Sequence, residues 1–262
     1  TQIIRITDMI KVENISTETV LGNAKQDQHE RVRSFYDLAI PIVDKYVTYC
    51  TDKSYLDFND LISRTASLFK NHPDIANKYK SKFQYILVDE FQDVNNLQVE
   101  LIKLTLTDDT QLFCVGDDWQ SIYGFRGSNV SYIIDFENHF KNARVVKLNL
   151  NYRSTQHIVG ASNEVIKHIK FKVDKDIHSS KKSEHKIVVF AGNSEEENIQ
   201  FAIEEVRKFQ EEGLTSEDIL FLYRRSKMFS NSFNQDKSYY HRLRDEGLKV
   251  QGKTIHAAKG LE

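Results

Sequence analysis

The sequence contains little glycine, proline or cysteine. Of 262 residues, 10 are glycine, 2 are proline and 2 are cysteine. Glycine and proline usually contribute about 7% and 5% of residues, so these low counts exclude collagen-like and low-complexity chains and favour long helices. Cys50 and Cys114 lie far apart, without the spacing of zinc ligands. A disulfide framework and a structural zinc site are therefore not expected, and a reducing cytoplasm fits best.

The sequence also lacks long apolar runs and a secretory leader. An apolar run of about 18 residues, which a membrane-spanning helix needs, is absent, so we expect no membrane association. Thr1 is followed by no basic and apolar leader, and a first residue other than Met suggests a fragment. Hydrophobic residues at 40% and aromatic residues at 11% exclude a disordered chain. The length predicts two modest domains or one large one.

The charges nearly cancel over the whole chain but not locally. Thirty-six basic and 38 acidic residues give a net charge of −2. Residues 141–190 contain eleven Lys or Arg against four acids, whereas residues 195–218 contain nine acids against two bases. Two interpretations stay open: solvated helix faces that alternate in charge, or a basic surface that follows a phosphate backbone.

Hydrophobic periodicity predicts alternating strands and helices after a helical start. Residues 1–55 are expected to be mainly helical, and residues 56–80 to hold one more helix. Apolar β-prone runs predict strands at 83–88, 111–115, 145–148, 186–190 and 218–223, with helices around 97–104, up to 166, and at 198–211. Strand, helix and strand in this order imply parallel sheets. We place a domain boundary near residue 150.

The first of these strands ends on two adjacent acids. Asp89 and Glu90 directly follow the apolar run at 83–88. A strand that delivers two carboxylates to its end can hold Mg²⁺ through one, while the other deprotonates an attacking water, as phosphoryl transfer requires. Two solvated acids at an ordinary strand end are the alternative that these residues alone leave open.

A second polar segment begins where the next expected strand ends. Residues 116–127 contain glycines that permit close backbone turns, and Gln120 can sense a phosphate or hold a water. The rings of Trp119, Tyr123 and Phe125 offer stacking faces for bases. Aromatic rings usually belong to a core, but the charged neighbours in this segment make full burial costly. We therefore expect at least one ring to be exposed.

Four stretches together resemble one family of motors. The sequences VDEFQD, GDDWQSIYGFRG, NYRS and TIHAAKGLE resemble helicase motifs II, III, IV and V of the UvrD/Rep-type superfamily 1 DNA helicases, in the family's order, at 88–93, 116–127, 151–154 and 254–262. LDFNDLI at 56–62 resembles the segment by which that family's chain re-enters its first motor domain. GDDWQ and the short spacing between Tyr223 and Thr254 look most like the helicase IV branch.

The resemblance implies an α/β fold of two RecA-like P-loop NTPase domains in tandem, both incomplete, with parallel sheets flanked by helices. Residues 1–55 would be the helical remnant of an accessory insertion. Residues 56–150 would form the later part of the first RecA-like domain. Residues 151–262 would form the earlier part of the second.

The resemblance also implies roles around MgATP. Asp89 would bind Mg²⁺, Glu90 would be the base that activates water, and Gln120 would couple the γ-phosphate to DNA. Tyr152 would stack on the adenine, and Arg153 would reach the γ-phosphate as an arginine finger does. Two residues of motif V would complete the nucleotide site: Gly260, and Glu262, which would contact the ATP ribose.

A DNA track is implied as well. Phe125 stands where the family usually has a stacking aromatic for single-stranded DNA, and Tyr123 and His256 would line the same track. Arg126 and Thr254 complete the expected DNA-binding residues. The expected partners are ATP and single-stranded DNA, or a junction of single- and double-stranded DNA.

The family's phosphate-binding loop, GxxxxGK followed by Thr or Ser, is missing ahead of the Asp-Glu pair. Residues 1–88 contain a single glycine, Gly22, outside any such pattern. Residues 247–254 match the pattern letter for letter. A working loop follows an apolar strand and opens a helix, whereas residues 239–246 predict a polar helix that Gly247 ends.

We therefore expect a fragment of an ATP-dependent DNA helicase or translocase, with the 3′→5′ polarity that the resemblance implies and no significant ATPase of its own. The alternative is a degenerate, non-catalytic DNA-binding or protein-docking module that keeps the motor fold. A phosphotransferase built on residues 247–254 would need a strand before Gly247, and the sequence predicts none there.

Overall fold

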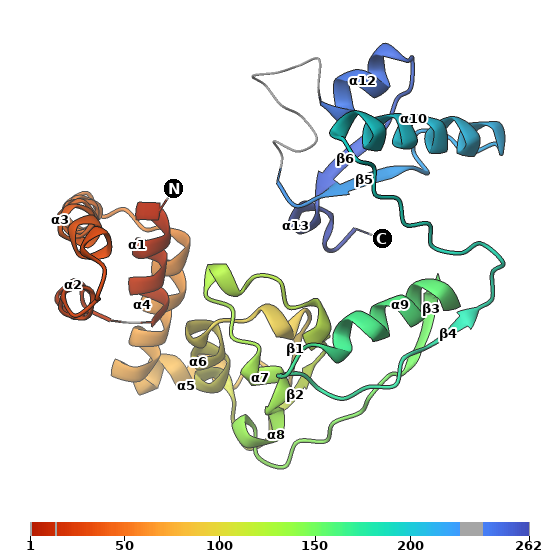
Figure 1. Ribbon diagram of the computed structural model, residues 1–262. Helices are drawn as coiled ribbons and strands as arrows, with labels where there is room; N and C mark the ends of the chain where they lie inside the picture. The colour runs from red at the N-terminus through yellow and green to blue at the C-terminus, as the bar shows by residue number, and fades with distance from the viewer. Residues whose placement is uncertain (1, 14, 226–237, 262) are drawn as a thin grey trace. The chain divides into compact units, whose positions relative to one another are not determined.

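The protein is described by a computed structural model that covers residues 2–13, 15–225 and 238–261. The chain divides into two compact units. Unit 1 comprises Thr1–Asn149 and Asn163–Ile177, and unit 2 comprises Leu150–Ser162 and His178–Glu262. Both contain small parallel sheets and helices, and unit 1 begins with a helical segment (Figure 1). The expected α/β fold is thus confirmed, whereas the three-part division of the chain stays a prediction.

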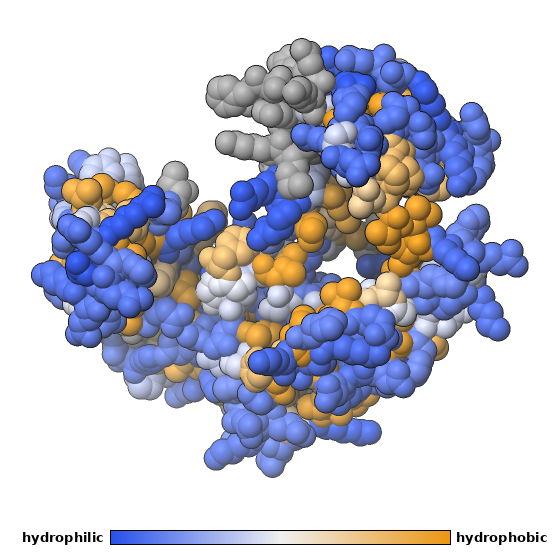
Figure 2. All heavy atoms as spheres, viewed as in Figure 1, coloured by the Kyte–Doolittle hydropathy of each residue, from blue (hydrophilic) through white to orange (hydrophobic). Residues whose placement is uncertain are grey.

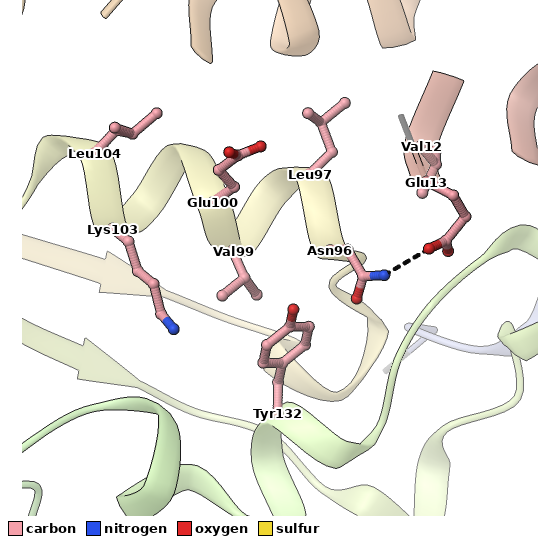
Figure 3. Close-up of a pocket in the computed structure, with 9 residues that line it drawn as sticks. All are labelled: Val12, Glu13, Asn96, Leu97, Val99, Glu100, Lys103, Leu104 and Tyr132. Carbon is pink, nitrogen blue, oxygen red and sulfur yellow. Dashed lines mark hydrogen bonds between the residues drawn. The ribbon is translucent and has the colours of Figure 1, made fainter. Parts of the chain in front are cut away.

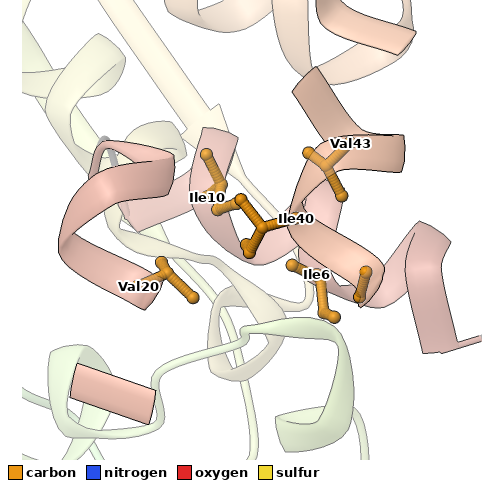
Figure 4. Packing of buried hydrophobic residues seen from close by; sticks show 6 residues of the cluster. Ile6, Ile10, Val20, Ile40 and Val43 are labelled. Atoms are coloured by element: carbon orange, nitrogen blue, oxygen red, sulfur yellow. The ribbon is translucent and has the colours of Figure 1, made fainter. Parts of the chain in front are cut away.

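Three helices at the start of unit 1 share an apolar core. They are α1 (Gln2–Glu13), α2 (Thr17–Lys25) and α3 (Glu30–Asp52). Ile6 and Ile10 lie one turn apart on the same face of α1, as the period of 3.6 residues requires. The side chains that pack together from the three helices are shown in Figure 4: Ile6, Ile10, Val20, Ile40 and Val43.

The single helix expected at 56–80 is two helices, α4 (Phe58–Asn71) and α5 (Pro73–Lys80). The break falls at His72 because a residue that precedes proline is disfavoured in helical conformation. Pro73 then occupies the first turn of α5, where its missing N–H costs nothing.

Ion pairs connect the start of α4 to α1. The side chains of Asp57 and Asp60 form a capping box at the first turn of α4. Lys11 of α1 lies 2.5 Å from Asp57 and 2.8 Å from Asp60. Burial disfavours the charged form of Lys11, but the hydrogen bonds to both carboxylates outweigh it, so the pKa of Lys11 is raised.

The sheet of unit 1 consists of two parallel strands, β1 (Tyr85–Val88) and β2 (Gln111–Cys114). The chain between them forms α6 (Asn96–Thr105), so the expected strand, helix and strand are confirmed. One face of the sheet packs on the cluster around Phe91 and Val99. On the other face Leu87 lies opposite Phe113, and both are exposed. Exposed apolar side chains recur over the surface in Figure 2.

Short helical turns follow the strands of unit 1. Two α-turns, α7 (Ser131–Ile134) and α8 (Phe136–His139), complete the cover of the Phe91 cluster. Three 3₁₀ turns follow the strand ends and carry most of the site described below: η1 (Phe91–Asp93), η2 (Asp118–Gln120) and η3 (Gly124–Arg126).

The described part of unit 2 contains two pairs of parallel strands. The first joins β3 (Leu150–Thr155) to β4 (His178–Lys181). Helix α9 (Gln156–Lys167) directly follows β3, and its residues up to Ser162 belong to unit 2, whereas those from Asn163 onwards belong to unit 1. The second joins β5 (Leu220–Tyr223) to β6 (Gln251–Thr254). Its remaining described helices are α10 (Glu195–Glu211), α12 (Tyr239–Asp245) and α13 (Ile255–Ala258). Its core contains Ile199, Ile203, Val206, Leu243 and Leu248.

Two expected strands are wrong. Residues 145–148 and 186–190 are irregular, and the strands lie a few residues away, in β3 and β4. Leu148 and Val189 are more than four-fifths exposed. An apolar β-prone run becomes a strand only where a partner strand and a covering layer are available, so propensity was overridden at both places. Within the described chain, no helix combines the length and apolarity that crossing a bilayer takes.

Candidate functional site

The carboxyl ends of β1 and β2 bring two polar segments together. Because the strands are parallel neighbours, Asp89 and Glu90 after β1 meet the residues that follow β2 at the same edge. The backbone pairing continues past both strands: the Val115 N–H donates to the Val88 carbonyl at 2.8 Å, and the Phe91 N–H donates to the Val115 carbonyl at 2.9 Å. Motifs II and III are therefore held side by side.

The backbone of Glu90 has an unusual conformation. Its φ of 51° and ψ of 40° lie in the left-handed region, which costs a non-glycine residue about 1–2 kcal/mol. The Asp89 Oδ1 atom accepts a hydrogen bond from the Glu90 N–H at 2.8 Å, and the 3₁₀ turn of η1 follows directly. Strain of this kind persists where surrounding contacts enforce it, and it is concentrated at functional sites.

Gln92 joins the two segments, although its place in the sequence did not mark it as a site residue. Its side chain is 1% exposed. The Nε2 amide donates to Glu90 Oε2 at 2.5 Å, and Oε1 accepts from the Asp117 N–H at 2.9 Å. The Ser121 hydroxyl donates to the Gln92 carbonyl. The available signal was a polar residue inside the motif VDEFQD, beside the buried Phe91.

Asp117 collects several hydrogen bonds at the start of motif III. Its Oδ2 accepts from Gln120 Nε2 at 3.0 Å, and its Oδ1 lies 2.5 Å from Lys175 Nζ. Burial alone raises the pKa of Asp117, but the hydrogen bonds from Lys175 and Gln120 and the charge of Lys175 outweigh it, so the pKa is lowered. Gln120 is thus connected through Asp117 and Gln92 to Glu90.

Trp119 is held by the chain around residue 173. Its indole Nε1 donates to the Val173 carbonyl at 3.1 Å, and the Lys175 Nζ lies 5.1 Å from the centre of its ring. The neighbouring Asp118 accepts from the Val173 N–H at 2.7 Å and pairs with Lys175. Of the three rings expected as stacking faces, Trp119 is therefore engaged within unit 1.

Phe125 and its neighbours form an exposed aromatic and basic surface. Phe125 is 46% exposed, and its ring centre lies 6.3 Å from that of Tyr123. The Arg126 guanidinium lies 5.2 Å from the Tyr123 ring and 5.6 Å from the Phe125 ring. Arg5 of α1, which lies in no motif of the sequence, also has its guanidinium 5.6 Å from the centre of the Phe125 ring. Rings and guanidinium groups of this kind suit bases and phosphates.

The expected nucleotide residues of motif IV belong to unit 2. Tyr152 and Arg153 lie in β3, and both are exposed. The Asn151 side chain fixes this stretch, because its Oδ1 accepts from the Arg153 N–H at 2.9 Å and from the Ser154 N–H at 2.8 Å. Their proposed roles at adenine and phosphate stay predictions.

The residues of motif V also belong to unit 2. Thr254 ends β6, and its hydroxyl caps α13 by accepting from the Ala257 N–H at 3.1 Å. His256 lies in α13 with its Nδ1 at 3.3 Å from an Arg224 guanidinium nitrogen. Gly260 has a φ of 81°, which suits glycine. Glu262 lies outside the described residues.

Residues 247–254 do not form a phosphate-binding loop. Helix α12 precedes them, and strand β6 occupies Gln251–Thr254, which is the reverse of the strand-to-helix order that such a loop needs. Gly247 has a φ of 75° and donates to the Arg244 carbonyl, while the Leu248 N–H donates to the Leu243 carbonyl. These two bonds form a Schellman motif, so Gly247 ends α12 as expected.

The residues present fit Mg²⁺ better than they fit a nucleotide. Asp89 and Glu90 provide hard carboxylate oxygens at a strand end, which is the kind of ligand that Mg²⁺ takes, one or two at a time. The backbone cradle for β- and γ-phosphates, normally a glycine-rich loop with its lysine, is matched only by residues 247–254, and their geometry does not fit. Asp89 and Glu90 would be the residues that hold the metal, and this role stays a prediction.

A hollow of about 410 Å³ lies elsewhere in unit 1, between α1, α6 and α7. Figure 3 shows Tyr132 facing α6, and the Asn96 amide donating to Glu13 of α1 at 2.8 Å. Burial, followed by the charges of Glu13 and Glu100, raises the pKa of Tyr132. The residues that line this hollow do not include any expected site residue, so it is separate from the site at the strand ends.

Comparison with known proteins agrees with these motifs. Residues 2–141 match the UvrD/REP helicase N-terminal domain, and residues 146–241 match the UvrD-like helicase C-terminal domain. The chain is 32% identical over 253 residues to the ATP-dependent DNA helicase PcrA of Staphylococcus epidermidis, and equally so to PcrA of Staphylococcus aureus. Each alignment covers 90% of this chain and 35% of the relative, so the chain spans about a third of their length. Because the first match alone covers more than half of the sequence, the chain belongs to the UvrD/REP family of helicases.

Proposed function

We propose that the chain provides part of the motor of an ATP-dependent DNA helicase or translocase that moves 3′→5′ along single-stranded DNA. The observation that carries the proposal is the set of hydrogen bonds that runs from the Glu90 carboxylate through the Gln92 side chain to the Asp117 backbone N–H, and from the Asp117 carboxylate to Gln120. A connection of this kind lets the residue that activates water and the residue that senses phosphate respond together. Membership of the UvrD/REP family and the similarity to ATP-dependent DNA helicases support the same interpretation.

In this proposal the two acids of motif II have separate tasks. Asp89 contributes a carboxylate ligand to Mg²⁺, which when bound neutralises charge on the transferring phosphoryl group. Glu90 accepts a proton from the attacking water, and the Gln92 amide at its Oε2 orients the carboxylate. Tyr152 and Arg153 serve the adenine and the γ-phosphate.

The proposed DNA track begins at the aromatic and basic surface around Phe125. Base stacking on an exposed ring contributes about 1–3 kcal/mol per base, and Arg126 supplies charge for the phosphates. Tyr123, Thr254 and His256 are proposed to contact the same strand.

The DNA-binding part of the proposal is testable on the 262-residue chain itself. We expect fluorescence anisotropy to detect binding of a labelled oligothymidine, and Phe125→Ala to weaken it by about 1–3 kcal/mol. Phe209→Ala, which removes a partly exposed ring from α10, is the matched control and should leave the affinity unchanged. Equal affinity of wild type and Phe125→Ala would remove Phe125 from the track.

The catalytic part needs a form of the protein that contains a phosphate-binding loop. There we expect Glu90→Gln to abolish DNA-stimulated ATP hydrolysis and to preserve nucleotide binding, because the amide keeps the shape of the carboxylate but accepts no proton. Appreciable turnover by this variant would exclude Glu90 as the base.

A second candidate is a DNA-binding or protein-docking module without hydrolysis. One observation favours it: the phosphate-loop pattern occurs in these 262 residues only at 247–254, where a helix precedes it and a strand follows, the reverse of the order that a working loop needs. The test uses a form of the protein that contains a phosphate-binding loop. If its affinity for DNA is the same with and without nucleotide, this second candidate is supported.

A further inference from the structure

A segment distant in sequence is docked on motif III. The stretch around Val173 and Lys175 lies more than 50 residues after Asp118, yet it contacts three consecutive residues of the motif. Its backbone pairs with Asp118 and with the Trp119 indole through the N–H and carbonyl of Val173. Its lysine pairs with both aspartates, at 2.5 Å each.

The lysine of this contact is buried together with its partner. The Lys175 side chain is 13% exposed and that of Asp118 is 2% exposed. A buried ion pair persists only where geometry and hydrogen bonds compensate for the loss of hydration, and here the Val173 N–H supplies a further hydrogen bond to Asp118. Lys175 belongs to the basic stretch at 141–190, but its ammonium is committed within unit 1 and not to a phosphate backbone.

The same lysine also determines how Asp117 is oriented. Lys175 Nζ lies at Oδ1 of Asp117, while the Gln120 amide donates to Oδ2 of the same carboxylate. The two oxygens belong to one planar group, so a cation that fixes the first also fixes the second. A third contact, from the Trp119 N–H to Oδ1, completes the restraint.

We propose that Lys175 is a positioning residue that sets the Gln120 side chain through Asp117. The inference rests on the proposed function, since it concerns how the side chain of the phosphate-sensing Gln120 is positioned. It adds a requirement outside the helicase motifs: the chain beyond α9 must be docked on motif III for Gln120 to be in place.

Trp119 provides a built-in probe because it is the single tryptophan of the chain. In Lys175→Met, we expect the Trp119 emission to move to longer wavelength and acrylamide to quench it more strongly. In the same variant, exchange of the Gln120 side-chain amide protons, followed by NMR, should become roughly tenfold faster as a charge-assisted restraint is lost. Lys175→Arg should restore both signals towards wild type. Lys170→Met, which removes an exposed lysine from the same region, should change neither.

A purely structural role predicts a different result. If Lys175→Met alters Trp119 but leaves the Gln120 amide protons unchanged, the lysine only holds the segment in place and the proposal is wrong. Should Lys175→Met not fold, Lys175→Gln carries the same test, because glutamine keeps a hydrogen-bond donor at this position while the cation is lost. Oligothymidine binding by wild type is measured separately, so a failure of the proposed function stays distinguishable from a failure of this inference.

Discussion

The Nε2 amide of Gln92 lies 2.5 Å from Oε2 of Glu90. The other end of the same buried amide accepts from the Asp117 backbone, so one side chain contacts both motifs. A glutamine can do this because it carries a donor and an acceptor on one planar group. The proposed catalytic carboxylate is therefore held by a residue from its own turn and, through it, by the end of the neighbouring strand.

Replacing Gln92 should destabilise unit 1. Gln92→Leu leaves the Asp117 N–H without its acceptor in a partly buried site, and we expect a loss of about 1–3 kcal/mol in the free energy of unfolding. Urea denaturation followed by Trp119 fluorescence measures it. Gln84→Leu, at an exposed position just before β1, is the control and should change the stability far less. Equal stability of the two variants would mean that the Gln92 contacts are energetically unimportant.

Gly116 and Gly160 should respond in opposite directions to alanine. A Cβ at Gly116 would lie 2.6 Å from Gln92 Oε1 and 3.1 Å from the Gln92 backbone nitrogen, so crowding should cost about 1–3 kcal/mol. A Cβ at Gly160, inside α9, meets nothing within 4 Å, and alanine there should stabilise by about 0.5–1 kcal/mol. Trp119 fluorescence reports the first variant and helical circular dichroism the second. A stabilising Gly116→Ala would show that Gln92 can move aside.

The pattern at residues 247–254 should have a structural effect and no catalytic one. Gly247→Ala forces a side chain into a left-handed conformation and should destabilise unit 2 by about 1–2 kcal/mol, as circular dichroism during denaturation would show. The purified 262-residue chain should hydrolyse no significant ATP, with or without DNA, and Lys253→Ala should change nothing. ATP turnover that Lys253→Ala abolishes would establish a phosphate-binding loop there.

The lowered pKa of Asp117 predicts an acid-sensitive contribution to stability. The ordinary carboxyl pKa is 3.8, and in the folded chain that of Asp117 lies below it. The folded state therefore binds fewer protons at this group, and its stabilisation is complete above pH 3.8 and is lost as the pH falls through the folded value. Urea unfolding at a series of acidic pH values should show this loss in wild type. In Asp117→Asn that part of the pH dependence should be missing, and identical curves would contradict the assignment.

Local signals in the sequence were sufficient for many elements. The β-prone runs at 83–88 and 111–115 contain β1 and β2, and Gly247 ends a helix. Both features follow from neighbouring residues, which set strand propensity and the end of a helix. The predictions of strands at 145–148 and 186–190 were wrong, because whether an apolar run is buried in a sheet depends on which distant segments pack against it. The prediction of a single helix at 56–80 was wrong for a reason that the local sequence contains: Pro73 disfavours helical conformation in the residue before it.

The sequence by itself determined the family, the order of the motifs and the identity of the acids after β1, because these depend on residue types at fixed spacing. Only the tertiary structure decided how these residues are held. It placed the Gln92 amide between two motifs and docked Lys175 on Asp117 across more than 50 residues of chain. Contacts between residues so far apart in the sequence arise when distant segments fold onto one another, and no local pattern in either segment encodes them.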